Sequence, residues 1–213
     1  MRFVLASASP RRAELLRAAG YTFDIVATDV DESMKLGESP SGYVRRLAAE
    51  KSMAALAVLK GGAISGAAQS FSPAAGRSDI AQASSPAEAI LVGADTAVVI
   101  EGEVLGKPRD DADAAAMLRR LSGRQHEVLT GISLRQGAYE LGRVETTTVW
   151  FIALTKNDID WYVASGECRD KAGAYAIQGL ASRFVPRIEG SFSNVVGLPV
   201  AALVELLTEF RQR

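Results

Sequence analysis

The sequence predicts a mixed α/β fold, in which one mixed β-sheet is flanked by helices. Strand-like and helix-like segments alternate along the chain, and several neighbouring strand-like segments are joined by turns short enough for antiparallel pairing. Of the 213 residues, 48% are hydrophobic and 23% are charged, as in ordinary soluble globular proteins. This length can bury one sizeable core, so we expect a single domain over residues 1–213, divided into two lobes.

The same composition excludes several classes of protein. The net charge of −1 does not favour nucleic-acid binding, which usually depends on an excess of positive charge. One cysteine excludes an internal disulfide, and one histidine excludes a His/Cys zinc cluster, so a bound metal would rest on carboxylates, which points to Mg²⁺ or Mn²⁺. The apolar stretch before Ala6 is too short for a signal peptide, and no apolar run approaches membrane-spanning length. We therefore expect a cytoplasmic protein with no membrane contact.

The chain begins with a strand over residues 2–6, a small-residue loop and a helix that starts at Ser9-Pro10 and stops at Gly20. Arg11 and Arg12 fall in the first turn of that helix. Solvated surface charges would account for most arginine pairs, but cations in a first turn oppose the helix dipole unless an anion is present. Strand, loop, helix N-terminus and arginines together predict an anion-binding site.

A second strand is expected over residues 22–27, followed by a loop that holds Asp29, Asp31 and Glu32. These acids are either a plain turn or metal ligands. The next helix starts at Ser39-Pro40 and reaches about Leu59. Lys51 lies on its apolar stripe, where it either extends its amine to water or points into a site.

Residues 61–89 differ in kind from the rest of the chain. They are rich in Gly, Ala, Ser and Pro and contain almost no large apolar residues. Such a composition cannot bury enough apolar surface to offset the entropy of ordering. We expect a flexible insertion that is dispensable for folding and activity.

The strand-like run 90–100 has only two polar side chains, Asp95 and Thr96. Asp95 either caps a turn at a strand end or is a site carboxylate at the carboxyl edge of the sheet, because a buried carboxylate needs compensation. Lys107 follows after a turn at 101–102 and a second strand, so it can return near Asp95. The need for cations favours the site, and it favours Lys51 pointing into that site.

The remaining elements follow from caps and periodicity. Asp110 and Thr155 open helices that stop at Gly123 and Gly166, and Pro199 opens a last amphipathic helix. Strands are expected over residues 125–135, 141–154 and 183–188, and strand character over 170–179. His126 falls within a strand among polar neighbours, which indicates a surface or cross-strand residue rather than a catalyst.

Three familiar motifs are excluded. Residues 102–107 suggest a phosphate-binding P-loop, but the spacing is one residue short and Pro108 stands where a Ser or Thr would bind magnesium. Asp95-Thr96 lacks the second aspartate of a hydrolase that forms a phosphoaspartate. The serines cannot form a catalytic triad, because the only histidine is the unsuitable His126.

Eight short segments together resemble the Maf family of nucleotide pyrophosphatases. They are Leu5–Arg12, Glu50–Lys51, Gly93–Thr96, Gly106–Pro108, Asp170–Tyr175, Ile177–Gly179, Gly190–Ser191 and Asn194–Pro199. The resemblance implies an elongated mixed α/β fold with a central cleft, related to the inosine-triphosphate pyrophosphatases. It also implies hydrolysis of nucleoside triphosphates to the monophosphate and pyrophosphate, dependent on a divalent cation. Residues 61–89 are much longer than the connection usual in the family.

The resemblance also assigns roles to residues. Asp95 matches the general base, and Glu32 a second carboxylate that would bind metal with Asp95 or orient water. The phosphate-binding and charge-neutralising groups would be Ser7, Arg12, Lys51 and Lys107. Arg11, Thr96 and Gln178 match the residues associated with dTTP and UTP. Gln178 offers a donor and an acceptor, as the edge of a pyrimidine requires.

Two alternatives remain open at this point. The main interpretation is a house-cleaning enzyme of the nucleotide pool. Because the family is associated with arrest of septum formation, the first alternative is a regulator of cell division that binds nucleotide. The second alternative is a pyrophosphatase that acts on 7-methyl-GTP or another modified nucleotide. The expected partner is a nucleoside triphosphate, and a homodimer is left open.

Overall fold

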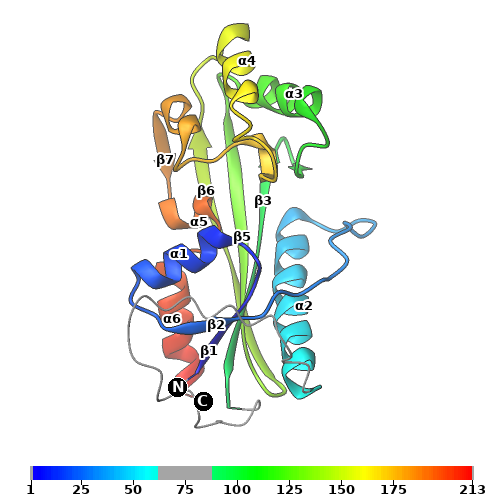
Figure 1. Ribbon diagram of the computed structural model, residues 1–213, viewed down its shortest axis with the longest axis vertical. Helices are drawn as coiled ribbons and strands as arrows, with labels where there is room; N and C mark the ends of the chain where they lie inside the picture. The colour runs from blue at the N-terminus through cyan, green and yellow to red at the C-terminus, as the bar shows by residue number, and fades with distance from the viewer. Residues whose placement is uncertain (1, 62–87, 213) are drawn as a thin grey trace.

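The computed structural model describes residues 2–61 and 88–212 of the chain. It contains one seven-stranded mixed sheet in the order β2-β1-β3-β5-β6-β7, with β4 paired to β3. The molecule is elongated, and helices cover the sheet on both faces (Figure 1). The predicted mixed α/β class is confirmed. The expected insertion at 61–89 lies almost entirely outside the described residues.

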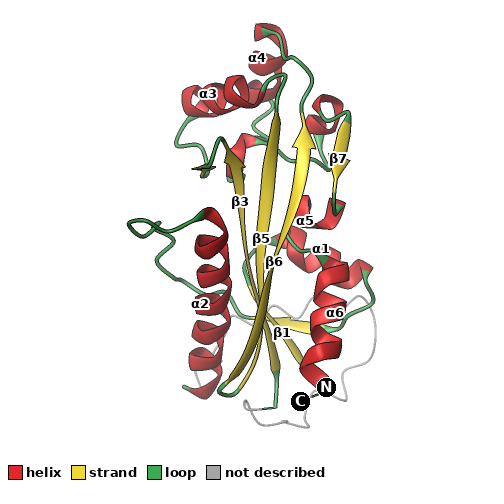
Figure 2. Cartoon of the chain, turned by 180° about the vertical axis from the view of Figure 1, so that it is seen from behind, coloured by secondary structure: helices red, strands yellow, loops and turns green. Residues whose placement is uncertain are grey.

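The strands differ greatly in length. Their bounds are β1 (Phe3–Ala6), β2 (Phe23–Ile25), β3 (Ile90–Ile100), β4 (Glu103–Leu105), β5 (Gln125–Gln136), β6 (Tyr139–Trp150) and β7 (Arg187–Glu189). Strand β1 is parallel to both β2 and β3, and the other pairings are antiparallel. Strands β3, β5 and β6 run side by side through almost the full length of the molecule (Figure 2).

Apart from the short α5, the helices begin where the sequence predicts. Their bounds are α1 (Pro10–Ala18), α2 (Pro40–Lys60), α3 (Asp111–Leu121), α4 (Lys156–Ala164), α5 (Phe192–Val196) and α6 (Val200–Arg211). Ser39, Asp110 and Thr155 each accept a hydrogen bond from a backbone N–H of the first turn, and Thr155 forms a full capping box with Asp158. Within the described ranges, no helix has both the length and the apolar character needed to span a membrane.

The hydrophobic core is divided between the two ends of the long strands. At one end, α1 and α6 pack on one face of the sheet and α2 packs on the other (Figure 1). Alternate residues of β3 serve the two faces there, with Val92 toward α6 and Leu91 toward α2. At the other end, a separate cluster joins Val98 to α3, α4 and the 3₁₀ segments.

Helix α2 approaches the sheet closely because glycines lie beneath it. A Cβ atom added to Gly93 would lie 2.1 Å from the carbonyl oxygen of Ala48, and one added to Gly131 would lie 2.2 Å from that of Val44. Gly131 is directly opposite Asp95 in the β3–β5 pairing. Any larger side chain at either position would push α2 away from the sheet.

Two predictions in the second half of the chain were wrong. Residues 170–179 do not have strand character, because Asp170, Gly173 and Ala174 adopt left-handed backbone angles and form a 3₁₀ turn (Ala172–Ala174). The strand expected at 183–188 is only the three-residue β7, preceded by another 3₁₀ segment (Leu180–Phe184). The short helix α5 carried no periodic signal and was not predicted.

His126 is not a surface residue. Its side chain is 2% exposed, and its Nε2 lies 2.8 Å from the Tyr175 hydroxyl, against the ring of Phe151. Burial lowers the pKa of His126 to about 4, so the ring is neutral. It lies in the hydrophobic core at the end of the long strands that carries α3 and α4, which we call the far lobe.

Candidate active site

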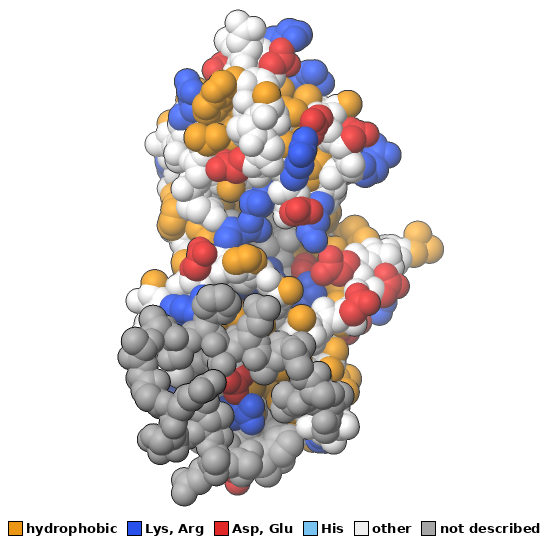
Figure 3. All heavy atoms as spheres, in the orientation of Figure 1, with side chains coloured by type: hydrophobic (Ala, Val, Ile, Leu, Met, Phe, Trp, Pro, Cys, Tyr) orange, Lys and Arg blue, Asp and Glu red, His pale blue; other side chains and the backbone are white. Residues whose placement is uncertain are grey.

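A pocket lies between the two ends of the molecule, where the short strands leave a gap in the sheet. Strand β1 ends at Ala6, which pairs with Gly93, and β4 begins to pair with β3 only at Val98. Residues 94–97 of β3 therefore lack a strand neighbour on that side, and three of them, Asp95, Thr96 and Ala97, line the pocket. Basic and acidic side chains gather around the middle of the visible face in Figure 3.

This geometry corrects the expected position of Asp95. Asp95 is not at the carboxyl end of its own strand but in the middle of β3, which continues beyond it in antiparallel pairing with β5. The strand that ends beside it is the parallel strand β1. The pocket therefore lies at a carboxyl edge, but the edge belongs to β1, and Asp95 reaches it from the adjoining strand.

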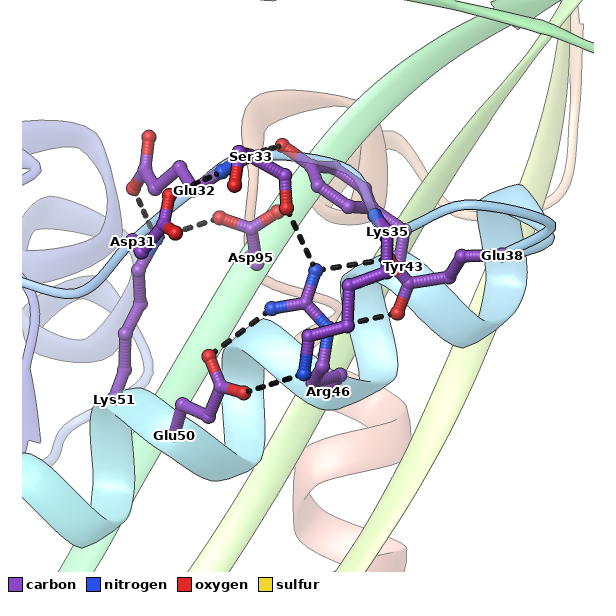
Figure 4. A network of polar contacts seen from close by, with 10 residues as sticks. All are labelled: Asp31, Glu32, Ser33, Lys35, Glu38, Tyr43, Arg46, Glu50, Lys51 and Asp95. Carbon is purple, nitrogen blue, oxygen red and sulfur yellow. Dashed lines mark hydrogen bonds and ion pairs between the residues drawn. The ribbon is translucent and has the colours of Figure 1, made fainter.

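Lys51 bridges the two predicted carboxylates. Its Nζ lies 2.6 Å from Asp95 Oδ1 and 2.7 Å from Glu32 Oε1 (Figure 4). The side chains of Lys51 and Asp95 are 8% and 10% exposed, whereas that of Glu32 is 49% exposed. Lys51 therefore points into the site and does not extend to water.

The two carboxylates differ in basicity. Burial raises the pKa of Asp95, although Lys51 and Arg12 act in the opposite direction. Burial would also raise the pKa of Glu32, but its hydrogen bond to Lys51 and the charges of Lys51 and Lys107 outweigh it, and the pKa is lowered. Asp95 is thus the better proton acceptor, and Glu32 stays ionised more readily.

Arg12 joins three parts of the chain below the pocket. Its Nε donates to the Gly197 carbonyl at 2.8 Å, its Nη1 to Ser7 Oγ at 3.0 Å and its Nη2 to Thr96 Oγ1 at 3.1 Å. Thr96 Oγ1 also lies 2.9 Å from Thr130 Oγ1. Ser7, Arg12 and Thr96 are therefore brought together, and the Thr96 hydroxyl is already engaged within the protein.

Arg11, Lys107 and Gln178 line the same pocket. None of the three side chains makes a hydrogen bond to another side chain or backbone group in the ranges 2–61 and 88–212. Their donors are therefore available to a ligand. Burial lowers the pKa of Arg11, with Glu14 and Asp170 acting against it. Lys107 lines the same pocket as Asp95, and its charge acts on Glu32.

Several pocket residues were missed from the sequence. Tyr43 lines the pocket, and its hydroxyl donates to the Glu32 carbonyl at 2.9 Å. Asp170 and Lys171 line it from the opposite lobe, within a segment that the family resemblance had already marked. Tyr43 sits beside the buried stripe of a helix and carried no separate signal.

The carboxylates have the character of a partial site for a hard divalent cation. Asp95 and Glu32 each place one oxygen within hydrogen-bond distance of Lys51 Nζ, so the two carboxylates converge, and in this structure the cation between them is the Lys51 ammonium. Within the described ranges, no cluster of three or more His, Cys, Asp or Glu side chains has the geometry of a metal site. Two carboxylates, completed by water and substrate phosphates, fit the way Mg²⁺ binds in phosphoryl-transfer enzymes.

Comparisons with known proteins identify the family of the chain. The family model described as "Maf-like protein" matches residues 2–210. A protein of Shewanella oneidensis named dTTP/UTP pyrophosphatase is 47% identical over 214 residues, with 98% of each chain covered. Proteins with the same name from Vibrio cholerae and Symbiobacterium thermophilum are each 44% identical, over 98% and 97% of this chain and 98% and 93% of theirs.

One solved structure, titled "The structure of the Staphylococcus aureus Ham1 protein", is similar with a TM-score of 0.42 and 14% identity, over 71% of this chain and 72% of that one. The family match over nearly the whole chain and the identity to the relatives are far stronger. The chain belongs to the Maf family.

Proposed function

We propose that this protein hydrolyses dTTP and UTP to the nucleoside monophosphate and pyrophosphate, in the cytoplasm. The observation that carries the proposal is the buried Lys51–Asp95 pair, which opens into a pocket lined with further cations. Relatives 42–47% identical over nearly the whole chain are named for this activity. Such a pocket supplies the two needs of phosphoryl transfer, neutralisation of charge and a placed proton acceptor.

The residues divide the reaction between them. The oxygens of the triphosphate are bound by Arg12, Lys51 and Lys107, together with the Ser7 hydroxyl. Asp95 accepts a proton from the water molecule that attacks the α-phosphorus. The bond from the α-phosphorus to the bridging oxygen breaks, and pyrophosphate leaves with the electron pair. The burial that raises the pKa of Asp95 makes it a stronger base for this step.

A divalent cation, Mg²⁺ or Mn²⁺, is part of this proposal. Glu32 and Asp95 would hold it, since they converge and are the acidic residues nearest to Lys51. When bound, the cation supplies neutralisation of the phosphate oxygens. Glu32 is suited to the role of a permanent ligand because its pKa is lowered.

Selection of the pyrimidine is assigned to Gln178 and Arg11, with Thr96 acting indirectly. Gln178 is exposed on the pocket wall and carries both a donor and an acceptor. Thr96 accepts a hydrogen bond from Arg12, so it holds that cation in place and does not need to contact the base.

The substitution Asp95→Asn tests the proposed chemistry. The amide keeps the shape of the side chain but cannot accept the proton, so turnover should fall by roughly 10²–10⁴. Nucleotide binding measured by calorimetry without metal should persist, because removal of a carboxylate from a group of cations does not weaken the binding of an anion; the metal is left out because Asp95 is also proposed to hold it. In oxygen-18 water, the wild-type enzyme should place the label in the nucleoside monophosphate.

The matched control is Asp160→Asn, the same change at an exposed aspartate of α4 that does not line the pocket. Its turnover should equal that of the wild type. Label found in pyrophosphate, or orthophosphate as the first product, would show that a different phosphorus is attacked. Wild-type protein that binds nucleotide but releases no pyrophosphate would favour the regulator instead.

A further inference from the structure

Glu32 reaches the site from a loop that is not held by hydrophobic packing. This acidic loop (residues 26–39) connects β2 to α2 and extends beside the molecule in Figure 1. Its residues 31–37 are all exposed, and Leu36 at the tip is fully exposed. Burial of apolar surface therefore does not fix the position of Glu32, and polar contacts must do so.

Most of the contacts to the rest of the loop come from Arg46, on the second turn of α2. Arg46 donates from Nε and Nη2 to the two carboxylate oxygens of Glu38, at 2.7 and 2.8 Å. Its Nη2 also donates to the Ser33 carbonyl at 3.0 Å, and its Nη1 to Glu50 at 3.1 Å. We call Arg46, Ser33, Glu38 and Glu50 the Arg46 cluster. Its hydrogen bonds attach the acidic loop to helix α2 (Figure 4).

The Arg46 cluster is partly shielded from solvent and strongly charged. The side chains of Arg46 and Glu38 are 16% and 12% exposed. The hydrogen bonds from Arg46 lower the pKa of Glu38 to about 2, so the carboxylate stays ionised at any working pH. Two parallel N–H···O bonds to one carboxylate fix orientation as well as distance, which a lysine cannot reproduce.

The part of the loop that Arg46 holds is adjacent in sequence to Glu32, the proposed cation ligand. Ser33, whose carbonyl Arg46 holds, is the neighbour of Glu32 in sequence. The Glu32 carbonyl itself accepts from the Tyr43 hydroxyl, one turn earlier on the same helix. The same helix carries Lys51, which binds the Glu32 carboxylate. Helix α2 thus controls both the backbone and the side chain of Glu32.

We propose that Arg46 is a positioning residue, which sets the affinity for the divalent cation by fixing the loop that presents Glu32. It does so without touching substrate or metal. This inference rests on the proposed function, because it assigns Glu32 to the cation. Residues that orient a metal ligand typically change metal affinity by about 10–100-fold when altered.

The central variant is Arg46→Lys, which keeps the charge and loses the paired hydrogen bonds. The Mg²⁺ concentration that gives half-maximal turnover should rise about tenfold, while kcat at saturating Mg²⁺ stays within about twofold. Tyr43→Phe, which removes only the hydroxyl contact, should shift the Mg²⁺ requirement in the same direction by a smaller factor. An unchanged Mg²⁺ requirement in both variants would overturn the proposal.

A double variant separates positioning from general loss of stability. If Arg46 acts through Glu32, adding Arg46→Lys to Glu32→Gln should raise the Mg²⁺ requirement no further than Glu32→Gln alone. If the two changes multiply, Arg46 acts by another route and the proposal is wrong. The control is Arg143→Lys, an arginine that also bridges two carboxylates, Glu205 and Glu209, away from the pocket. Its Mg²⁺ requirement should match that of the wild type.

A measurement without turnover keeps this inference distinct from the proposed function. Mn²⁺ is titrated into the protein in the presence of a dUTP analogue whose α,β-bridging oxygen is replaced by NH, which prevents turnover. Electron paramagnetic resonance then measures the free Mn²⁺ at each step. Mn²⁺ affinity should fall in Arg46→Lys and in Glu32→Gln. Weakened Mn²⁺ binding in a protein that releases no pyrophosphate would defeat the proposed function alone. Unaltered Mn²⁺ binding in an active enzyme would defeat this inference alone.

Discussion

Two buried cations stand beside the pocket, and their partners differ in charge. Lys51 contacts two carboxylates, whereas Arg12 donates to a carbonyl and two hydroxyl oxygens, which are all neutral. Burial lowers the pKa of Arg12, and the charge of Asp95 acts against it. The positive charge of Arg12 is therefore oriented without being cancelled by a direct ion pair, and it can act on an anion in the pocket.

At the same scale, Gln178→Ala tests the assignment of base selection. Loss of a hydrogen-bonding partner in a pocket costs about 1–3 kcal/mol, since the base is left unpaired. We expect kcat/KM for dTTP and UTP to fall by roughly 5–150-fold. Hydrolysis of inorganic triphosphate, which has no base, should change little.

Gln125→Ala provides the comparison, because Gln125 is exposed at the start of β5 and does not line the pocket. Its substrate ranking should equal that of the wild type. If Gln178→Ala preserves the ranking of nucleotides, another residue reads the base.

Sequence reasoning succeeded for residues whose chemistry conflicts with their surroundings. Asp95 in an apolar strand and Lys51 on an apolar helix face both require partners, and the structure shows that they are partners of one another. Arg46 and Tyr43 gave no such signal. A polar residue at the edge of a helix has the same pattern whether it faces water or holds a loop, so only the fold reveals its contacts.

At the scale of elements, the seating of α2 on the sheet fixes the Lys51–Asp95 distance. Gly131→Ala would place a methyl group 2.2 Å from the Val44 carbonyl, so the helix must move outward. Overpacking of this kind typically costs about 1–3 kcal/mol of unfolding free energy. We expect a lower midpoint in urea and a loss of turnover, because Lys51 moves with the helix.

Gly106→Ala is the control for stability, since an added Cβ there meets no atom within 4 Å and its backbone angle is ordinary. Its urea midpoint should match that of the wild type within error. An equally small change in Gly131→Ala would mean that α2 adjusts freely, and that the glycines do not set its position.

Element starts were predictable because a capping residue is a local signal. Ser39, Asp110 and Thr155 lie where the helices begin. Residues 170–179 were mispredicted because alternating small and apolar residues are also compatible with a strand. Packing of Gly173 against Val98, where a Cβ would lie 2.8 Å from Cγ1, is a long-range contact that local pattern cannot encode.

At the scale of the whole molecule, the two lobes share their longest strands. Strands β3, β5 and β6 contribute residues to the hydrophobic clusters at both ends of the molecule. Neither lobe therefore has a sheet of its own. We expect thermal unfolding in one transition, with calorimetric and van't Hoff enthalpies equal. Tryptophan fluorescence reports on the far lobe through Trp150 and Trp161, and it should coincide with far-ultraviolet circular dichroism of the whole chain. Two separated transitions would show that the lobes unfold independently.

The mixed fold class followed from the alternation of strands and helices, and the structure confirms it. The arrangement of strands did not follow. Nothing in the run 90–100 indicates that its first residues pair with β1 and its last with β4. The gap between those two pairings creates the pocket, so the site depended on register, which hydrophobic pattern leaves open.

The hydrogen bond from Arg12 to the Gly197 carbonyl joins residues 185 positions apart. Contacts of such separation close large loops, and they form only after most of the chain entropy has been lost. During synthesis, Arg12 emerges long before Gly197, so this hydrogen bond cannot form until the later residue is made. A nascent chain that ends before Gly197 lacks this acceptor. Assembly of the part of the pocket around Arg12 therefore belongs to a late stage of folding, after Gly197 has been synthesised.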